Sequence, residues 1–97
     1  MSSVNILATI RFPIEQETEA KEKLIAMLEP SRAEVGNVTY SLFQDQTEQA
    51  CFIFQEVWHS AEAFTAHQKT AHFIELLGYL KDNAQSVDIQ QLSRLDL

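Results

Sequence analysis

The stretch from Cys51 to Phe73, CFIFQEVWHSAEAFTAHQKTAHF, predicts a strand, a turn and the start of a helical region. Within its first eight residues, every second side chain is Phe, Phe, Glu or Trp, and this period of two places the four on one face of a sheet. The carboxylate in this aromatic row is Glu56, which we expect either to pair with a donor or to line a cavity. Ser60 and Thr70 each precede a helical pattern and are suited to cap a helix N-terminus.

The rest of the chain supplies the elements around this stretch. Alternation of residue types predicts four strands, at 4–12, 38–43, 51–58 and 87–95. Apolar residues at helical spacing predict a helix from Glu15, with Gly36 as the stop after one extra turn. A second helical region, in two pieces, lies between Ser60 and a turn at 83–86, and the connector at 45–49 makes a hairpin of the two middle strands. The order is β-α-β-β-α-β, a ferredoxin-like α+β fold with one four-stranded antiparallel sheet.

The length of 97 residues predicts a single domain, 1–97, with one core. Two helices cover only one face of such a sheet, yet both faces of the first three strands carry large apolar side chains. These are Leu7, Phe43, Ile53 and Val57 on one face, and Ile10, Tyr40, Leu42 and Phe54 on the other. Because something must cover the second face, we expect a homodimer packed sheet to sheet.

The net charge of −7 argues against nucleic acid and acidic membranes as partners, because both would repel this surface. The single Cys excludes an internal disulfide. The sequence starts without a basic segment followed by a long apolar run, so we expect no signal peptide, no membrane span and a cytoplasmic protein.

A set of short motifs extends over nearly the whole chain: Arg32–Asn37, Tyr40, Asp45, Glu56–Ser60, Ala63, His67, Thr70 and His72–Phe73. This set resembles the antibiotic biosynthesis monooxygenase (ABM) domain family. The resemblance implies a dimeric α+β barrel in which each subunit has a pocket between sheet and helices. Family members include oxygenases of quinols and polycyclic phenols that need no metal or flavin, haem-degrading proteins, and an isomerase of a phosphorylated sugar signal.

We interpret His67, Glu56 and Trp58 as the candidate catalytic residues. A neutral imidazole at His67 can take a phenolic proton, Glu56 can orient or polarise His67, and Trp58 can form a pocket wall for a flat substrate. Each also has a structural alternative: His67 bridges helix and sheet, Glu56 pairs with an Arg or a backbone amide, and Trp58 is part of the core.

Four further residues are candidates for substrate binding: Tyr40, Phe54, Phe64 and His72. Tyr40 has a core role as its alternative, and His72 a structural role near a helix N-terminus. The resemblance to oxygenases that need no metal or flavin implies that this chain needs no cofactor. We also expect no metal site, because His67 and His72 are five residues apart rather than the four that put two imidazoles on one helix face. Only a break between the two helical pieces would change that spacing. In the haem-degrading members of the family that this sequence resembles, the axial His lies further along the second helical region. The corresponding stretch here, 73–77, contains no His, so the resemblance disfavours haem degradation.

Two classes of function remain. The first is a cofactor-independent monooxygenase that acts on a quinol-like or other aromatic small molecule with molecular oxygen. The second is a non-catalytic binding or structural dimer of the same fold. An isomerase of a phosphorylated sugar signal is a third possibility, which requires basic residues inside the pocket.

Overall fold

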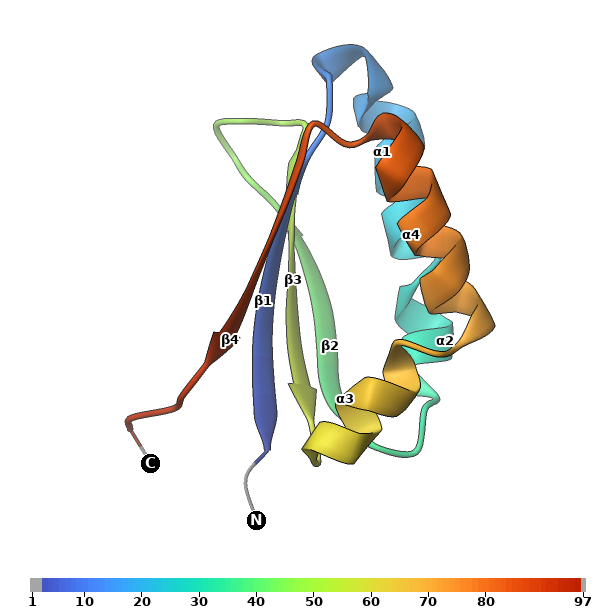
Figure 1. The fold of residues 1–97 in the computed structure, drawn as a ribbon. Helices are drawn as coiled ribbons and strands as arrows, with labels where there is room; N and C mark the ends of the chain where they lie inside the picture. The colour runs from blue at the N-terminus through green and yellow to red at the C-terminus, as the bar shows by residue number, and fades with distance from the viewer. Residues whose placement is uncertain (1–2, 97) are drawn as a thin grey trace.

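A four-stranded antiparallel sheet forms one layer of the protein, and the helices form the other (Figure 1). The computed structural model describes residues 3–96. The strands are β1 (Val4–Arg11), β2 (Asn37–Gln44), β3 (Cys51–Trp58) and β4 (Ser86–Leu92), in the spatial order β2-β3-β1-β4. The predicted ferredoxin-like order and the single antiparallel sheet are confirmed. The last strand ends at Leu92, not Leu95, because Leu92 pairs with Asn5 and β1 begins only one residue before that.

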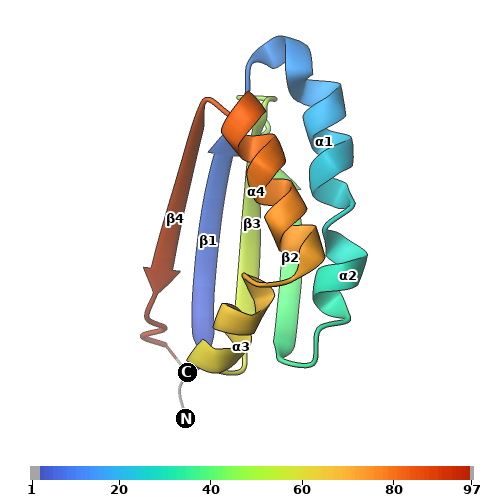
Figure 2. The same cartoon turned by 45° about the vertical axis from the view of Figure 1, so that its right-hand side comes forward.

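All helices lie on the same face of the sheet (Figure 2). They are the 3-10 turn η1 (Ile14–Gln16), α1 (Glu17–Ile25), α2 (Leu28–Arg32), α3 (Ala61–His67) and α4 (Ala71–Asn83). The first helical region is thus interrupted before α2, and Pro30 lies in the first turn of α2. There its missing N–H costs little, because the first N–H groups of a helix have no intrahelical partner.

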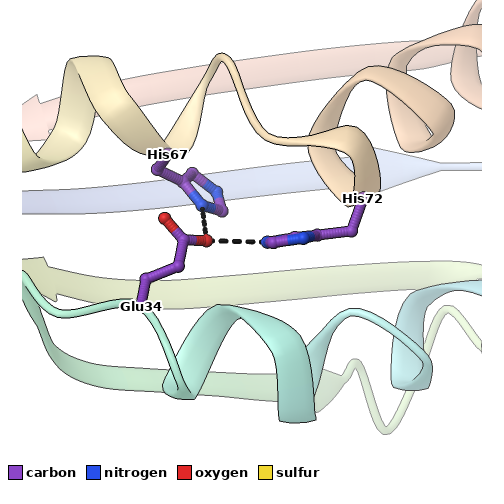
Figure 3. Close-up of side chains that lie close together, drawn as sticks. All are labelled: Glu34, His67 and His72. Carbon is purple, nitrogen blue, oxygen red and sulfur yellow. Dashed lines mark hydrogen bonds and ion pairs between the residues drawn. The ribbon is translucent and has the colours of Figure 1, made fainter.

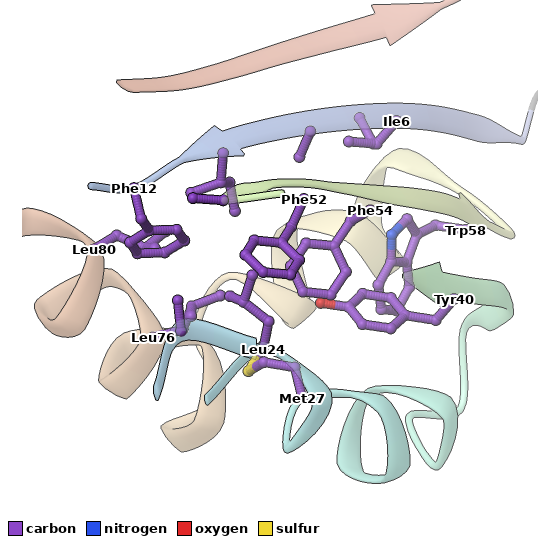
Figure 4. Packing of buried hydrophobic residues seen from close by; sticks show 14 of the residues in the cluster. Ile6, Phe12, Leu24, Met27, Tyr40, Phe52, Phe54, Trp58, Leu76 and Leu80 are labelled. Atoms are coloured by element: carbon purple, nitrogen blue, oxygen red, sulfur yellow. The ribbon is translucent and has the colours of Figure 1, made fainter. Parts of the chain in front are cut away.

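The core fills the space between the sheet and the helices (Figure 4). Alternate residues of β1 and β3 are buried, as the period of two predicted. The largest fully buried side chains include Trp58, Phe52, Phe54, Ile10 and Leu24. The apolar side chains of α4 are not all buried: Leu77 is about half exposed and borders a cleft together with Val87 and Ile89 of β4.

The opposite face of the sheet carries no helix (Figure 1). Phe43 is 53% exposed there, and Leu7, Ile53 and Val57 are only partly buried. Phe43 pairs with Ile53 and Val57 with Asn5, so these side chains belong to neighbouring strands of one surface. The chain by itself therefore leaves an apolar patch facing solvent.

Gly36 follows the last turn before β2, where the sequence predicted a helix stop. Its backbone does not have a positive φ, so the left-handed conformation is not the reason for Gly here. A Cβ added at Gly36 would lie 2.2 Å from the Cβ of Ala63. Gly36 therefore permits a close approach between this loop and α3, and its carbonyl accepts a hydrogen bond from the N–H of His59 at 2.8 Å.

Candidate functional site

The joint between α3 and α4 places two histidines. Ser60 Oγ accepts a hydrogen bond from Ala63 N–H at 3.1 Å, and Thr70 Oγ1 accepts one from Phe73 N–H at 3.2 Å, so both predicted caps are confirmed. The Thr70 hydroxyl also donates to the His67 carbonyl at 2.7 Å. These bonds connect the end of α3 to the start of α4. The break between the two helices places His67 and His72 on the same side, facing Glu34 (Figure 3).

Glu34, in the turn after α2, accepts hydrogen bonds from both imidazoles. Its Oε2 lies 2.7 Å from Nδ1 of His67 and 2.7 Å from Nε2 of His72 (Figure 3). Because a carboxylate oxygen is an acceptor, we assign the donated protons to the two facing ring nitrogens. One carboxylate therefore joins three segments: the turn after α2, the end of α3 and the first turn of α4.

The imidazole of His67 is 1% exposed and is surrounded by aromatic rings. The centroid of Trp58 lies 4.4 Å away, that of Phe73 5.0 Å and that of Tyr40 5.7 Å. Burial lowers the pKa of His67 below its ordinary value, and Glu34 only partly offsets this effect. The ring is therefore neutral at neutral pH and serves as a hydrogen-bonded packing element between sheet and helices.

Glu56 is buried on the inner face of β3, but its partner is Trp58. The indole Nε1–H donates to Oε1 of Glu56 at 2.9 Å. The expectation that Glu56 orients His67 is thus wrong in this structure: the carboxylate bonded to His67 is Glu34. Burial raises the pKa of Glu56 to about 7, the indole hydrogen bond lowers it in part, and the negative charge of Glu34 raises it further.

Glu56 lines a narrow cleft between the sheet and helices α3 and α4. The cleft has a volume of about 60 Å³ and an almost entirely apolar lining. Its aromatic walls are Tyr40, Phe54, Phe64 and Phe73. Tyr40 pairs with Glu56 across β2 and β3, and burial raises the pKa of Tyr40, so its hydroxyl keeps its proton. Glu56 is the one carboxyl among the described residues that line this space.

The structure therefore divides the predicted site residues into two groups. Glu56 lines the cleft together with the expected substrate-binding residues Tyr40, Phe54 and Phe64. Trp58 and His67 are packed behind this lining, in contact with each other. His72 borders a different hollow, of about 160 Å³, between α1 and α4, so its expected place in the aromatic cleft is not what the structure shows.

Comparison with known proteins assigns the chain to a family. The sequence pattern described as "Antibiotic biosynthesis monooxygenase" matches residues 3–77. This chain belongs to the antibiotic biosynthesis monooxygenase family. The fold is similar to that of PA3566 from Pseudomonas aeruginosa. The two sequences are 32% identical, and the crystal structure of PA3566 superposes with a TM-score of 0.93 over 99% of this chain and 97% of that one. The structure of Rv0793 from Mycobacterium tuberculosis, 23% identical, has the same fold, with a TM-score of 0.92 over 99% and 98% of the two chains.

Two relatives of this ABM-family chain share its sequence over about two thirds of its length. The Bacillus subtilis protein named "Putative monooxygenase YcnE" is 35% identical over 68% of this chain and 70% of its own length. The Synechocystis protein sll1783 is 38% identical over 66% of this chain, and the match spans only 46% of that relative. The family description and the name of the Bacillus subtilis relative both refer to a monooxygenase, and neither names a substrate.

Glu34 is the site residue that the sequence did not reveal. It is 33 residues before His67 and 38 before His72, and no local spacing connects residues so far apart. In the sequence Glu34 instead resembled the second half of a capping box with Ser31.

Among residues 3–96, no helix is long and apolar enough to cross a membrane.

Proposed function

We propose that this ABM-family chain is a monooxygenase that needs no bound cofactor and oxidises a quinol-like or other aromatic small molecule. One observation carries the proposal: a cleft with aromatic walls contains one carboxyl, Glu56, whose pKa is about 7. Aromatic walls suit a flat ring, and a group with a pKa near the working pH both accepts and releases protons efficiently.

The chemistry requires little more than proton removal. Loss of a proton from a phenolic O–H or an activated C–H gives an anion that passes one electron to O₂. The substrate radical and superoxide combine to a peroxide anion, which takes back the proton that the base removed and becomes a hydroperoxide. The O–O bond then breaks as the same carbon loses its hydrogen, which gives a carbonyl group and one water. The substrate supplies all the electrons, and one oxygen atom enters the product.

Within this mechanism Glu56 is the proton acceptor, because it faces the cleft whereas His67 does not. Trp58 and His67 are positioning residues. The Trp58 indole N–H fixes Oε1 of Glu56 at 2.9 Å, and the imidazole packs against that indole at 4.4 Å. Glu34 in turn fixes the imidazole, so Glu34, His67 and Trp58 form a chain of contacts that ends at the acceptor.

The substrate enters where α4 and β4 diverge. The cleft of about 60 Å³ is smaller than the ~150 Å³ cavity that holds one benzene, so a ring requires this end to widen. Leu77 of α4 and Val87 and Ile89 of β4 line this end, and all three are about half exposed. These apolar side chains form an entrance to the cleft that can widen without exposing the buried core.

The homodimer belongs to the same proposal. Leu7, Phe43, Ile53 and Val57 lie on the sheet face that the helices leave bare. A second copy placed sheet to sheet removes this patch from water on both subunits. The helices and the cleft of each subunit then stay on the outside of the dimer, open to substrate.

The test is oxygen consumption by chelator-treated protein supplied with naphthohydroquinones, catechols or anthrones. We expect uptake above the spontaneous rate with at least one class, and a loss of roughly 10²-fold or more in Glu56→Gln, the scale of a general-base contribution. Glu22→Gln, at an exposed position of α1, is the matched control and should retain full activity. Equal rates in wild type and Glu56→Gln would remove Glu56 from the mechanism.

The alternative is a non-catalytic dimer of the same fold, which binds aromatic compounds without transforming them or has only a structural role. The small volume of the cleft favours it, because little room is left for a substrate. Quenching of Trp58 fluorescence by these compounds, with no oxygen uptake, would support that function instead. The isomerase of a phosphorylated sugar is disfavoured, because the described residues that line the cleft include no Lys or Arg to hold a phosphate.

A further inference from the structure

A second site with metal-ligand chemistry lies at the joint between α3 and α4. Oε2 of Glu34, Nδ1 of His67 and Nε2 of His72 all lie within 4.8 Å of one another (Figure 3). Two imidazoles and one carboxylate are a donor set that binds divalent zinc and iron in many proteins. We infer that Glu34, His67 and His72 form a binding site for a divalent first-row transition metal ion, separate from the aromatic cleft.

The donors already stand near the spacing that one ion needs. Atoms bound to one ion at about 2.0–2.1 Å in tetrahedral geometry lie roughly 3.3 Å apart. The carboxylate oxygen is now 2.7 Å from each ring nitrogen, and all three donor atoms lie within 4.8 Å of one another. A slight withdrawal of Glu34 and a small turn of His72 would make room, with each imidazole proton moving to the nitrogen that faces away.

The site is preorganised on one side and open on the other. The His67 ring is held by the surrounding aromatic rings, and the Thr70 hydroxyl fixes the His67 carbonyl. Glu34 and His72 are 14% and 23% exposed, so solvent reaches the two remaining donors. An ion can therefore enter without unfolding α3 or α4.

The charges around the site favour a cation on balance. Glu75 lines the hollow that His72 borders, and the whole chain has a net charge of −7. Lys23 lines the same hollow and opposes the cation, although its ammonium also lies over the Tyr79 ring, 5.7 Å from the centroid. Bound metal would replace two hydrogen bonds by coordination at the point where the turn after α2 meets α3 and α4, so it should also raise the melting temperature.

The experiment titrates chelator-treated full-length protein with Zn²⁺ by calorimetry and with Co²⁺ by visible absorption. We expect one equivalent to bind wild type, and the affinity to fall by roughly tenfold or more in His72→Gln and in Glu34→Gln, as even outer-shell changes at metal sites produce. His59→Ala removes an exposed histidine outside the cluster and should bind like wild type. Circular dichroism establishes that each variant is folded.

Histidine ring signals in NMR spectra provide a readout that needs no variant. Zn²⁺ should shift the signals of His67 and His72 and leave those of His59 unchanged. No uptake by wild type, equal affinity in His72→Gln, or a loss of binding in His59→Ala would overturn the inference. Oxygen uptake by chelator-treated protein says nothing against the metal site, and a failure to bind Zn²⁺ says nothing against the oxygenase proposal. The two proposals can therefore fail separately.

Discussion

Replacing Glu56 by Gln should change how the stability of the protein depends on pH. Folding raises the pKa of Glu56 from its ordinary value of 4.5 to about 7. Between these values the folded state retains a proton that the unfolded state has lost, so the free energy of unfolding falls as the pH rises through this range. Glu56→Gln keeps an oxygen that can accept from the Trp58 indole and has no proton to lose.

The magnitude follows from the two pKa values. The difference of about 2.5 pKa units, at about 1.4 kcal/mol each, corresponds to about 3–4 kcal/mol over the whole range. About 1 kcal/mol of this is lost below pH 5.5, where the unfolded state already releases its proton, so about 2 kcal/mol remains between pH 5.5 and 8.5. The Gln side chain also brings amide hydrogens into an apolar cleft, which adds a cost that does not vary with pH.

The assay is urea unfolding of both proteins at one protein concentration and at pH values from 5.5 to 8.5, above the sequence pI of about 4.7. The difference in unfolding free energy, variant minus wild type, should rise by about 2 kcal/mol over this range. His67 acts in the opposite direction, because its lowered pKa makes stability rise with pH up to about 6.5, and it is present in both proteins. A difference that is constant with pH would show that Glu56 is ionised in the folded protein at pH 5.5 and would refute the reasoning.

Three further predictions test other parts of the structure. Gly36→Ala should lower the free energy of unfolding by about 1–3 kcal/mol, because its Cβ would collide with Ala63, whereas Gly78→Ala, with open space around the added Cβ in α4, should raise it by about 0.5–1 kcal/mol in the same denaturation experiment. His67→Ala should strongly reduce turnover of an aromatic substrate and move the pH profile of the residual activity, because His67 positions Glu56 through Trp58, while the proposed dimer stays intact; unchanged turnover and profile would remove His67 from the site. Phe43→Glu should convert the proposed dimer to monomer in sedimentation at micromolar concentration, and a wild-type protein that is already monomeric would contradict the proposed sheet-to-sheet dimer.

The sequence alone determined the elements and the faces they present. The alternation from Cys51 to Trp58 fixed which side chains point inward, since successive residues of a strand face opposite sides. Ser60 and Thr70 marked two helix starts, since their side-chain oxygens bond to the free N–H groups of the first turn. These are local rules, and each depends only on residues a few positions apart.

Only the tertiary structure decided which groups meet. It brought Glu34 to both His67 and His72, and contacts between residues 33 and 38 positions apart depend on how the turn after α2 packs against α3 and α4. Because Glu34 occupies His67, Glu56 bonds instead to Trp58, its near neighbour on β3. The reason for Gly36 also appears only in three dimensions, since the collision it avoids is with a helix 27 residues later. Periodicity indicates which way a side chain points, whereas its partner is decided by how distant segments pack together.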